Sequence, residues 1–133
     1  MESIRSVMEA IAAQLTDRTG LRAQDTVPNK INPPALFLNL TSSRPGTFGA
    51  DSLDIEMDVV AFVSSIVDRN QRLLYDYVSV GTDVSIFDAL ASDLTFGIEG
   101  VSGTAGEFRN LGLDEIAAYN LYGGAVSLAV SIT

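Results

Sequence analysis

The stretch LDIEMDVVAFV, residues 53–63, alternates acidic and apolar side chains more regularly than any other part of the chain. Successive side chains of a β-strand point to opposite faces of the sheet, so a period of two predicts a strand. One face of this strand carries three carboxylates, and the other is apolar. The acidic face comprises Asp54, Glu56 and Asp58, and the apolar face Leu53, Ile55, Met57, Val59, Ala61 and Val63.

The segment before this strand reads as a long connection. Residues 35–40 form an apolar run typical of a buried strand, and residues 41–51 then separate the two strands. Most hairpin loops have about 2–5 residues, so an eleven-residue loop is either functional or disordered. Its Phe and Arg, if exposed, are types that are enriched at protein interfaces. We therefore expect an assembly interface here, formed by Arg44, Pro45, Gly46, Thr47, Phe48 and Gly49.

The order of the remaining elements gives the fold class. Apolar residues at three- and four-residue steps predict a helix over residues 2–17, with Gly20 as its stop. A short strand is expected at 21–24. Further on, the sequence predicts two helices, one that opens at Asp68 and ends before Gly81 and one that opens at Ser85 and ends before Gly97. Turns are expected at Gly100, Gly103 and Gly106, and strands at 107–113 and 116–122. A turn or bulge is expected at Gly123–Gly124, before a last strand.

Because strands and helices do not alternate regularly, the order favours an α+β fold. We expect a mainly antiparallel β-sheet with the N-terminal helix and one or two further helices packed on one face. The length of 133 residues and the lack of a linker or repeat predict a single domain over residues 1–133.

Composition excludes several classes of function. The chain has neither Cys nor His, which removes disulfides, thiol nucleophiles, Cys/His zinc sites and imidazole bases. Its net charge of −9 is opposite to that of a protein that grips nucleic acid. The first residues do not follow the pattern of a signal peptide. Residues 116–133 carry no charge, but their period of two and their glycines favour strands over a membrane helix. We expect a soluble protein without a membrane partner.

The three carboxylates of the acidic strand are the main candidates for chemistry. Asp54, Glu56 and Asp58 could bind a hard cation or act as an acid/base pair. However, a straight strand spreads such ligands about 6–7 Å apart, which favours a solvated or assembly-facing surface. The glycine-rich segments at 97–100 and 103–106 are not followed by Gly-Lys-Ser/Thr, so they predict no phosphate loop. We expect no cofactor, no metal and no catalytic residue.

Several short segments, taken in order, are similar to those of a known family: the tail terminator proteins of long-tailed (siphovirus) bacteriophages, especially phages of actinobacteria. The chain resembles this family in the order of its pieces over most of its length. The segments are VPNKINPPALF (27–37), GTFG (46–49), VAFV (60–63), DRNQRLLYDY (68–77), SIFDAL (85–90) and YNLYGGA (119–125).

The resemblance implies a virion structural protein that is not an enzyme. Such a protein forms a hexameric ring that caps the tail tube, ends tube polymerisation and joins the tail to the head. Its partners would be further copies of itself, the major tail tube protein and a head–tail connector or stopper. It would be located at the head–tail junction, after assembly in the host cytoplasm, and genome DNA would pass through without specific binding.

The charge of the chain fits this expectation. Six copies at −9 each would carry about −54, and an acidic lumen would repel the phosphates of the passing DNA. We expect Asp54, Glu56 and Asp58 to line that lumen. Two alternatives stay open: another neck or minor tail structural protein, and a small-molecule-binding or carboxylate-dependent enzyme domain.

Overall fold

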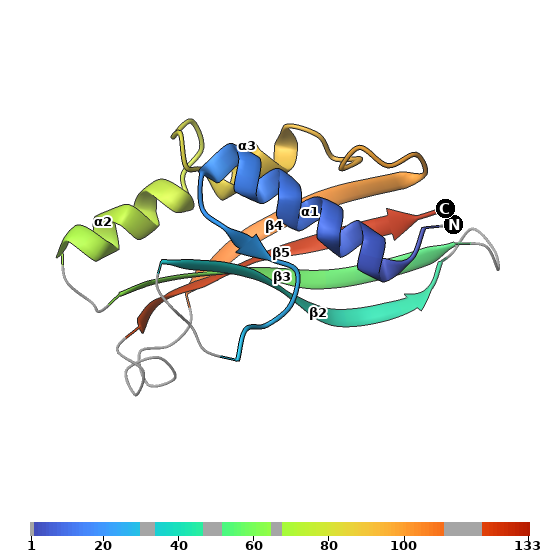
Figure 1. Cartoon of the computed structure of the whole chain (residues 1–133), viewed down its shortest axis with the longest axis horizontal. Helices are drawn as coiled ribbons and strands as arrows, with labels where there is room; N and C mark the ends of the chain where they lie inside the picture. The colour runs from blue at the N-terminus through green and yellow to red at the C-terminus, as the bar shows by residue number, and fades with distance from the viewer. Residues whose placement is uncertain (1, 30–33, 47–51, 65–67, 111–120) are drawn as a thin grey trace.

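Figure 1 shows the computed structural model, which describes residues 2–29, 34–46, 52–64, 68–110 and 121–133. Three helices and five strands alternate irregularly along this part of the chain. In order, they are α1 (Ile4–Thr19), β1 (Ala23–Gln24), β2 (Ala35–Pro45), β3 (Leu53–Ser64), α2 (Asp68–Tyr77), α3 (Ile86–Ala91), β4 (Val101–Asn110) and β5 (Leu121–Ile132).

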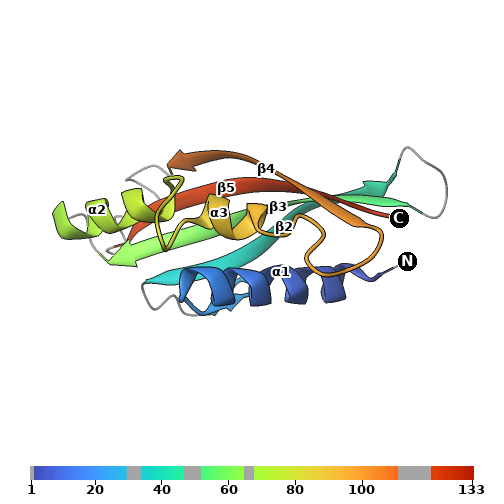
Figure 2. The same cartoon turned by 90° about the horizontal axis from the view of Figure 1, so that it is seen from above.

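The strands form one sheet in the order β1-β2-β3-β5-β4. Only the short β1 pairs in parallel with its neighbour; all other pairs are antiparallel. The helices lie on one face of this sheet, with α1 and α3 side by side (Figure 2). The predicted α+β fold, with a mainly antiparallel sheet and an N-terminal helix, is confirmed.

Helix α1 follows from its sequence pattern. The Ser3 side chain caps its start by accepting a hydrogen bond from the backbone N–H of Ser6, and Gly20 ends it in the left-handed conformation at φ 76°. Its apolar stripe packs in the core of the protein: Val7, Met8, Ile11, Ala12 and Leu15 are buried. The helix predicted over residues 2–17 is therefore confirmed, with its bounds displaced by two residues.

The acidic-apolar strand is β3, and it lies at the centre of the sheet between β2 and β5. The odd-numbered residues of its apolar face lie on the helix side, and from Ile55 to Val63 they are buried. Val60 and Phe62, on the opposite face, are also buried, and the Phe62 ring lies 6.0 Å from that of Phe37. The face away from the helices is therefore polar over the first half of β3 and apolar over the second.

The connection expected at residues 41–51 is shorter than predicted, because β2 continues to Pro45. Residues Ser42 to Pro45 pair with β3, and the register shifts between Leu40 and Ser42. This shift is a β-bulge at Thr41, whose hydroxyl donates a hydrogen bond to the carbonyl oxygen of Glu56. The prediction that Arg44 and Pro45 belong to a loop was wrong: both lie in β2.

Gly100 lies in a turn, as predicted, but the other glycines of the second half that were predicted to mark turns or a bulge lie inside strands. Gly103 and Gly106 lie inside β4, and Gly123 and Gly124 lie inside β5. A Cβ atom on Gly123 would lie 2.0 Å from the carbonyl oxygen of Ala61, so a glycine there permits close approach of two strands. The strand predicted at 107–113 begins earlier, at Val101, and residues 111–120 lie outside the described part of the chain.

In the described ranges, no helix has both the length and the apolar character needed to cross a membrane.

Candidate functional site

The sheet has one face that points away from the helices. One half of this face carries most of the polar side chains of the strands. Strand register places the three carboxylates of β3 on this face beside hydroxyl groups and two arginines from the neighbouring strands. We call this surface the polar face. Its residues are Ser42 and Arg44 of β2, Asp54, Glu56 and Asp58 of β3, Ser127, Ala129 and Ser131 of β5, and Ser102, Thr104 and Arg109 of β4.

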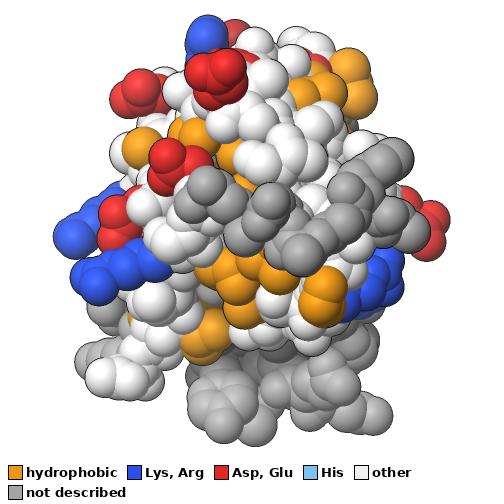
Figure 3. Space-filling view, turned by 90° about the vertical axis from the view of Figure 1, so that its right-hand side faces the viewer, with side chains coloured by type: hydrophobic (Ala, Val, Ile, Leu, Met, Phe, Trp, Pro, Cys, Tyr) orange, Lys and Arg blue, Asp and Glu red, His pale blue; other side chains and the backbone are white. Residues whose placement is uncertain are grey.

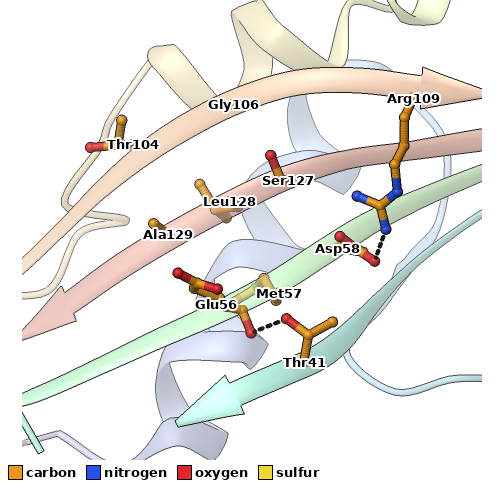
Figure 4. Close-up of a pocket in the computed structure, with 10 residues that line it drawn as sticks. All are labelled: Thr41, Glu56, Met57, Asp58, Thr104, Gly106, Arg109, Ser127, Leu128 and Ala129. Carbon is orange, nitrogen blue, oxygen red and sulfur yellow. Dashed lines mark hydrogen bonds and ion pairs between the residues drawn. The ribbon is translucent and has the colours of Figure 1, made fainter. Parts of the chain in front are cut away.

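A groove of about 500 Å³ runs across the middle of the polar face (Figure 4). Two bulges flank it, one at Thr41 in β2 and one between Ala105 and Phe108 in β4. Bulges redirect side chains and are common beside functional sites. The residues that line this polar groove are Thr41, Glu56, Met57, Asp58, Thr104, Gly106, Arg109, Ser127, Leu128 and Ala129.

The second bulge brings Arg109 into the groove. In Figure 4 the side chain of Arg109 reaches from β4 across β5 to Asp58 on β3, and its Nη2 lies 2.6 Å from Asp58 Oδ2. The side chain of Asp58 is only 13% exposed, whereas that of Arg109 is 53% exposed. The hydrogen bond and the charge of Asp58 raise the pKa of Arg109 above its ordinary value. Asp58 is thus an ion-paired carboxylate, with its Oδ2 atom held by Arg109.

Asp54 and Glu56 differ from Asp58 in this respect. Glu56 is exposed and Asp54 half-buried, and no cation of the described residues forms an ion pair with either. Arg44 lies opposite Asp54 in the strand register but does not pair with it. Two carboxylates on this face are therefore available to a partner.

The prediction that Asp54, Glu56 and Asp58 share one sheet face is confirmed, but the face is not uniformly acidic. Arg109 neutralises Asp58, and Arg44 adds a second positive charge nearby. Acidic and basic side chains are also interspersed over the end of the molecule at which the two termini lie (Figure 3). Across the residues that the structure describes, no three acidic side chains are grouped closely enough to hold a metal ion.

Only part of the predicted assembly interface belongs to the described residues. Arg44 and Pro45 lie on the exposed end of β2, and Gly46 donates a backbone hydrogen bond of 2.9 Å to the carbonyl oxygen of Ser52. Thr47, Phe48 and Gly49 lie outside the described residues. The structure therefore places Arg44 on the polar face, next to a carboxylate, and not at the tip of a loop.

Sequence reasoning missed the contributions of β4 to the groove, namely Thr104, Gly106 and Arg109. The signal was present in residues 101–105, where Val, Ser, Gly, Thr and Ala alternate with a period of two. The three glycines at 100, 103 and 106 are typical of turns and obscure this alternation.

No protein-family model matches the chain, and no curated protein is a significant match to its sequence.

Proposed function

We propose that this chain is a structural protein of a bacteriophage virion, which forms a ring on the tail tube, ends tube polymerisation and joins the tail to the head connector. The resemblance of its segments to tail terminator proteins supports this proposal. Within the structure, the observation that best supports the proposal is the polar face. It is a broad surface, bounded by two sheet edges, that no described helix covers.

A surface of this kind suits a protein that must stay dissolved until it meets its partners. Interfaces formed by such proteins are about as polar as the rest of their surface. The polar face has hydroxyl groups, a groove and two carboxylates that pair with no cation of the described ranges, all on one sheet. These features allow specific contacts without a large apolar patch that would promote aggregation.

The same geometry supports an enzyme less well. The acid/base pair considered for these carboxylates would need two groups that can exchange protons with a substrate. In the groove, Asp58 is held by Arg109. Glu56 is the other carboxylate of the lining, and it forms no ion pair with the residues that the structure describes.

The mixed charge of the polar face also supports a protein contact better than a DNA-facing lumen. In the proposed ring, repulsion of the genome would come from the net charge of −9 on every copy and not from Asp54, Glu56 and Asp58 alone. This leaves the polar face free for the ring neighbours, the tube or the connector.

The test is genetic and uses the phage whose genome encodes this chain. A stop codon early in the gene should yield tails of excessive and variable length that are not joined to heads. The wild-type gene supplied in trans should restore joined tails of normal length. Tail lengths are measured by electron microscopy, and gold-labelled antibody against the chain should mark the head–tail junction of wild-type virions. Unjoined tails of normal length would indicate a neck protein instead, and infectious virions of normal form that lack the chain would overturn any structural role.

A further inference from the structure

Helix α2 has an exposed side that nothing described covers. Leu74 and Tyr77 are buried against the sheet, while the opposite side of the helix presents Arg69, Arg72 and Tyr75 at steps of three residues. Residues three apart on a helix are surface neighbours. Arg69 and Arg72 form no hydrogen bond or ion pair with the residues that the structure describes, and Tyr75 is 53% exposed. We call these three residues the α2 stripe.

The composition of the α2 stripe is typical of a binding surface. Arg and Tyr are among the residue types that dominate binding energy at protein interfaces. Two adjacent arginines without an ion pair to any described residue are also unusual in a chain with eight basic and seventeen acidic residues. Their charge is opposite to that of the unpaired carboxylates on the polar face.

The charges on the two surfaces are opposite in sign, and they are also similarly spaced. Arg69 and Arg72, three residues apart on a helix, have Cβ atoms about 5–6 Å apart. Asp54 and Glu56, two residues apart on one side of β3, are about 6–7 Å apart. Thr104 and Ser127, which line the polar groove together with Glu56, add hydroxyl groups that can donate and accept hydrogen bonds.

These two surfaces cannot meet within one molecule. Asp54 is near the first residue of β3, whereas α2 follows the last residue of that strand, Ser64. Ten residues of extended strand span about 33 Å. In Figure 1, α2 lies at one end of the sheet, and the start of β3 lies at the other end, beside the two termini.

We propose that the α2 stripe of one copy docks on the polar face of the next copy, with Arg69 and Arg72 paired to Asp54 and Glu56 and Tyr75 against the groove. The contact joins two different surfaces, so it is heterologous: each copy offers one donor end and one acceptor end. Repeated contacts of this type close into a ring or continue as a filament. That the contact closes a ring on the tail tube rests on the proposed function; the contact itself does not.

A cysteine pair tests the contact directly, because the chain has no Cys of its own. We would make the double variant Tyr75→Cys/Thr104→Cys, which leaves all four charges in place, and treat the purified chain with a short bis-maleimide. The proposal expects a ladder of cross-linked oligomers. The matched control, Tyr75→Cys/Ala13→Cys, moves the second thiol to an exposed site on α1 on the helix side of the sheet. Equal cross-linking of the two variants, or none in either, would overturn the proposal.

Charge reversal tests the pairing. Arg69→Glu/Arg72→Glu and Asp54→Arg/Glu56→Arg should each weaken self-association at least about tenfold, as measured by sedimentation at low salt. The quadruple variant, with the charges exchanged, should recover it. The control Arg18→Glu/Arg22→Glu makes the same change in net charge as Arg69→Glu/Arg72→Glu, at exposed arginines outside both surfaces. A control that weakens association equally, or a quadruple variant that does not recover, would refute the pairing.

The failure of this inference is separable from that of the proposed function. Cross-linking and sedimentation use the purified chain, whereas tail length and head joining are measured in the phage. Long, unjoined tails after loss of the gene, together with no cross-link, would keep the function and refute the contact. A specific cross-link, together with infectious virions that lack the chain, would keep the contact and refute the function. Circular dichroism of every variant separates loss of contact from loss of fold.

Discussion

The guanidinium of Arg109 and the carboxylate of Asp58 are joined across an entire intervening strand. Arg109 lies on β4 and Asp58 on β3, and β5 runs between them. Neighbouring strands are about 4.8 Å apart, so the pair spans nearly 10 Å of sheet, which only a long side chain can bridge. The ion pair thus links an edge strand to the central strand over the floor of the polar groove.

We expect this pair to contribute more to stability than an ordinary surface pair. In a double-mutant cycle of Asp58→Ala and Arg109→Ala, the coupling free energy should be about 1 kcal/mol, because Asp58 is largely shielded from water. The control is the Arg5–Glu9 pair of α1, whose side chains are 87% and 55% exposed. Its coupling should be about 0.3 kcal/mol. Urea unfolding measures both cycles, and equal couplings would contradict the expectation.

Gln14 of α1 should stabilise the contact between α1 and α3. Its side-chain amide donates to the carbonyl oxygens of Ala89, Leu90 and Asp93 at 2.8, 3.3 and 3.1 Å. The first two belong to the last turn of α3, where carbonyls lack helical partners, and Asp93 follows the helix. Gln14→Met removes the donor and should cost about 1 kcal/mol of unfolding free energy.

The isosteric variant Gln14→Glu separates this donation from packing. Its carboxylate would face the carbonyl oxygens with negative charge, so it should cost about twice as much as Gln14→Met at neutral pH. Unfolding in urea measures both variants. A Gln14→Glu variant as stable as the wild type would show that the amide is not needed as a donor.

Asp93 gives a pH-dependent contribution to stability. Hydrogen bonds from the Thr95 hydroxyl, the Thr95 backbone N–H and the Gly97 backbone N–H lower the pKa of its carboxyl. A carboxyl whose pKa is lowered on folding stabilises the protein above its unfolded pKa of about 3.9. That stabilisation is lost as the pH falls through the lower, folded pKa.

The variant Asp93→Asn should therefore melt at a lower temperature than the wild type at pH 7, and the difference should shrink as the pH falls below about 4. Melting followed by circular dichroism across this range checks it. Asp83→Asn is the matched control, because Asp83 is exposed and has no hydrogen bond to the described residues. A constant difference for Asp93→Asn at all pH values would contradict the assignment.

Local patterns were sufficient to predict the central part of the fold. The period of two in β3, the apolar stripe of α1 and the Ser85 cap of α3 each depend on neighbouring residues alone, and all three are confirmed. The end of β2 was missed because its Ser- and Thr-rich residues have the composition of a loop. Its strand pairing comes from β3, which lies elsewhere in the sequence.

The ion pair in the groove could not be predicted for a related reason. Ser102 and Thr104 lie on the polar face, so simple alternation would put residue 108 there and turn Arg109 to the helix side. The bulge at Gly106 and Glu107 adds one residue and reverses this, so Phe108 faces the core and Arg109 the groove. A single bulge, set by pairing with β5, therefore decides the chemistry of the candidate site.

Glycines inside the strands should differ sharply in what they tolerate. A Cβ on Gly123 would lie 2.0 Å from the Ala61 carbonyl oxygen, which is backbone and cannot move aside, so Gly123→Ala should cost about 2–3 kcal/mol. On Gly106 the obstacle is the Ser127 hydroxyl at 2.2 Å, which can rotate away, so Gly106→Ala should cost less than about 1 kcal/mol. Urea unfolding ranks the two variants. Ser127→Ala should remove the cost at Gly106 but leave that at Gly123 unchanged; equal costs at both positions would mean that close strand approach does not explain these glycines.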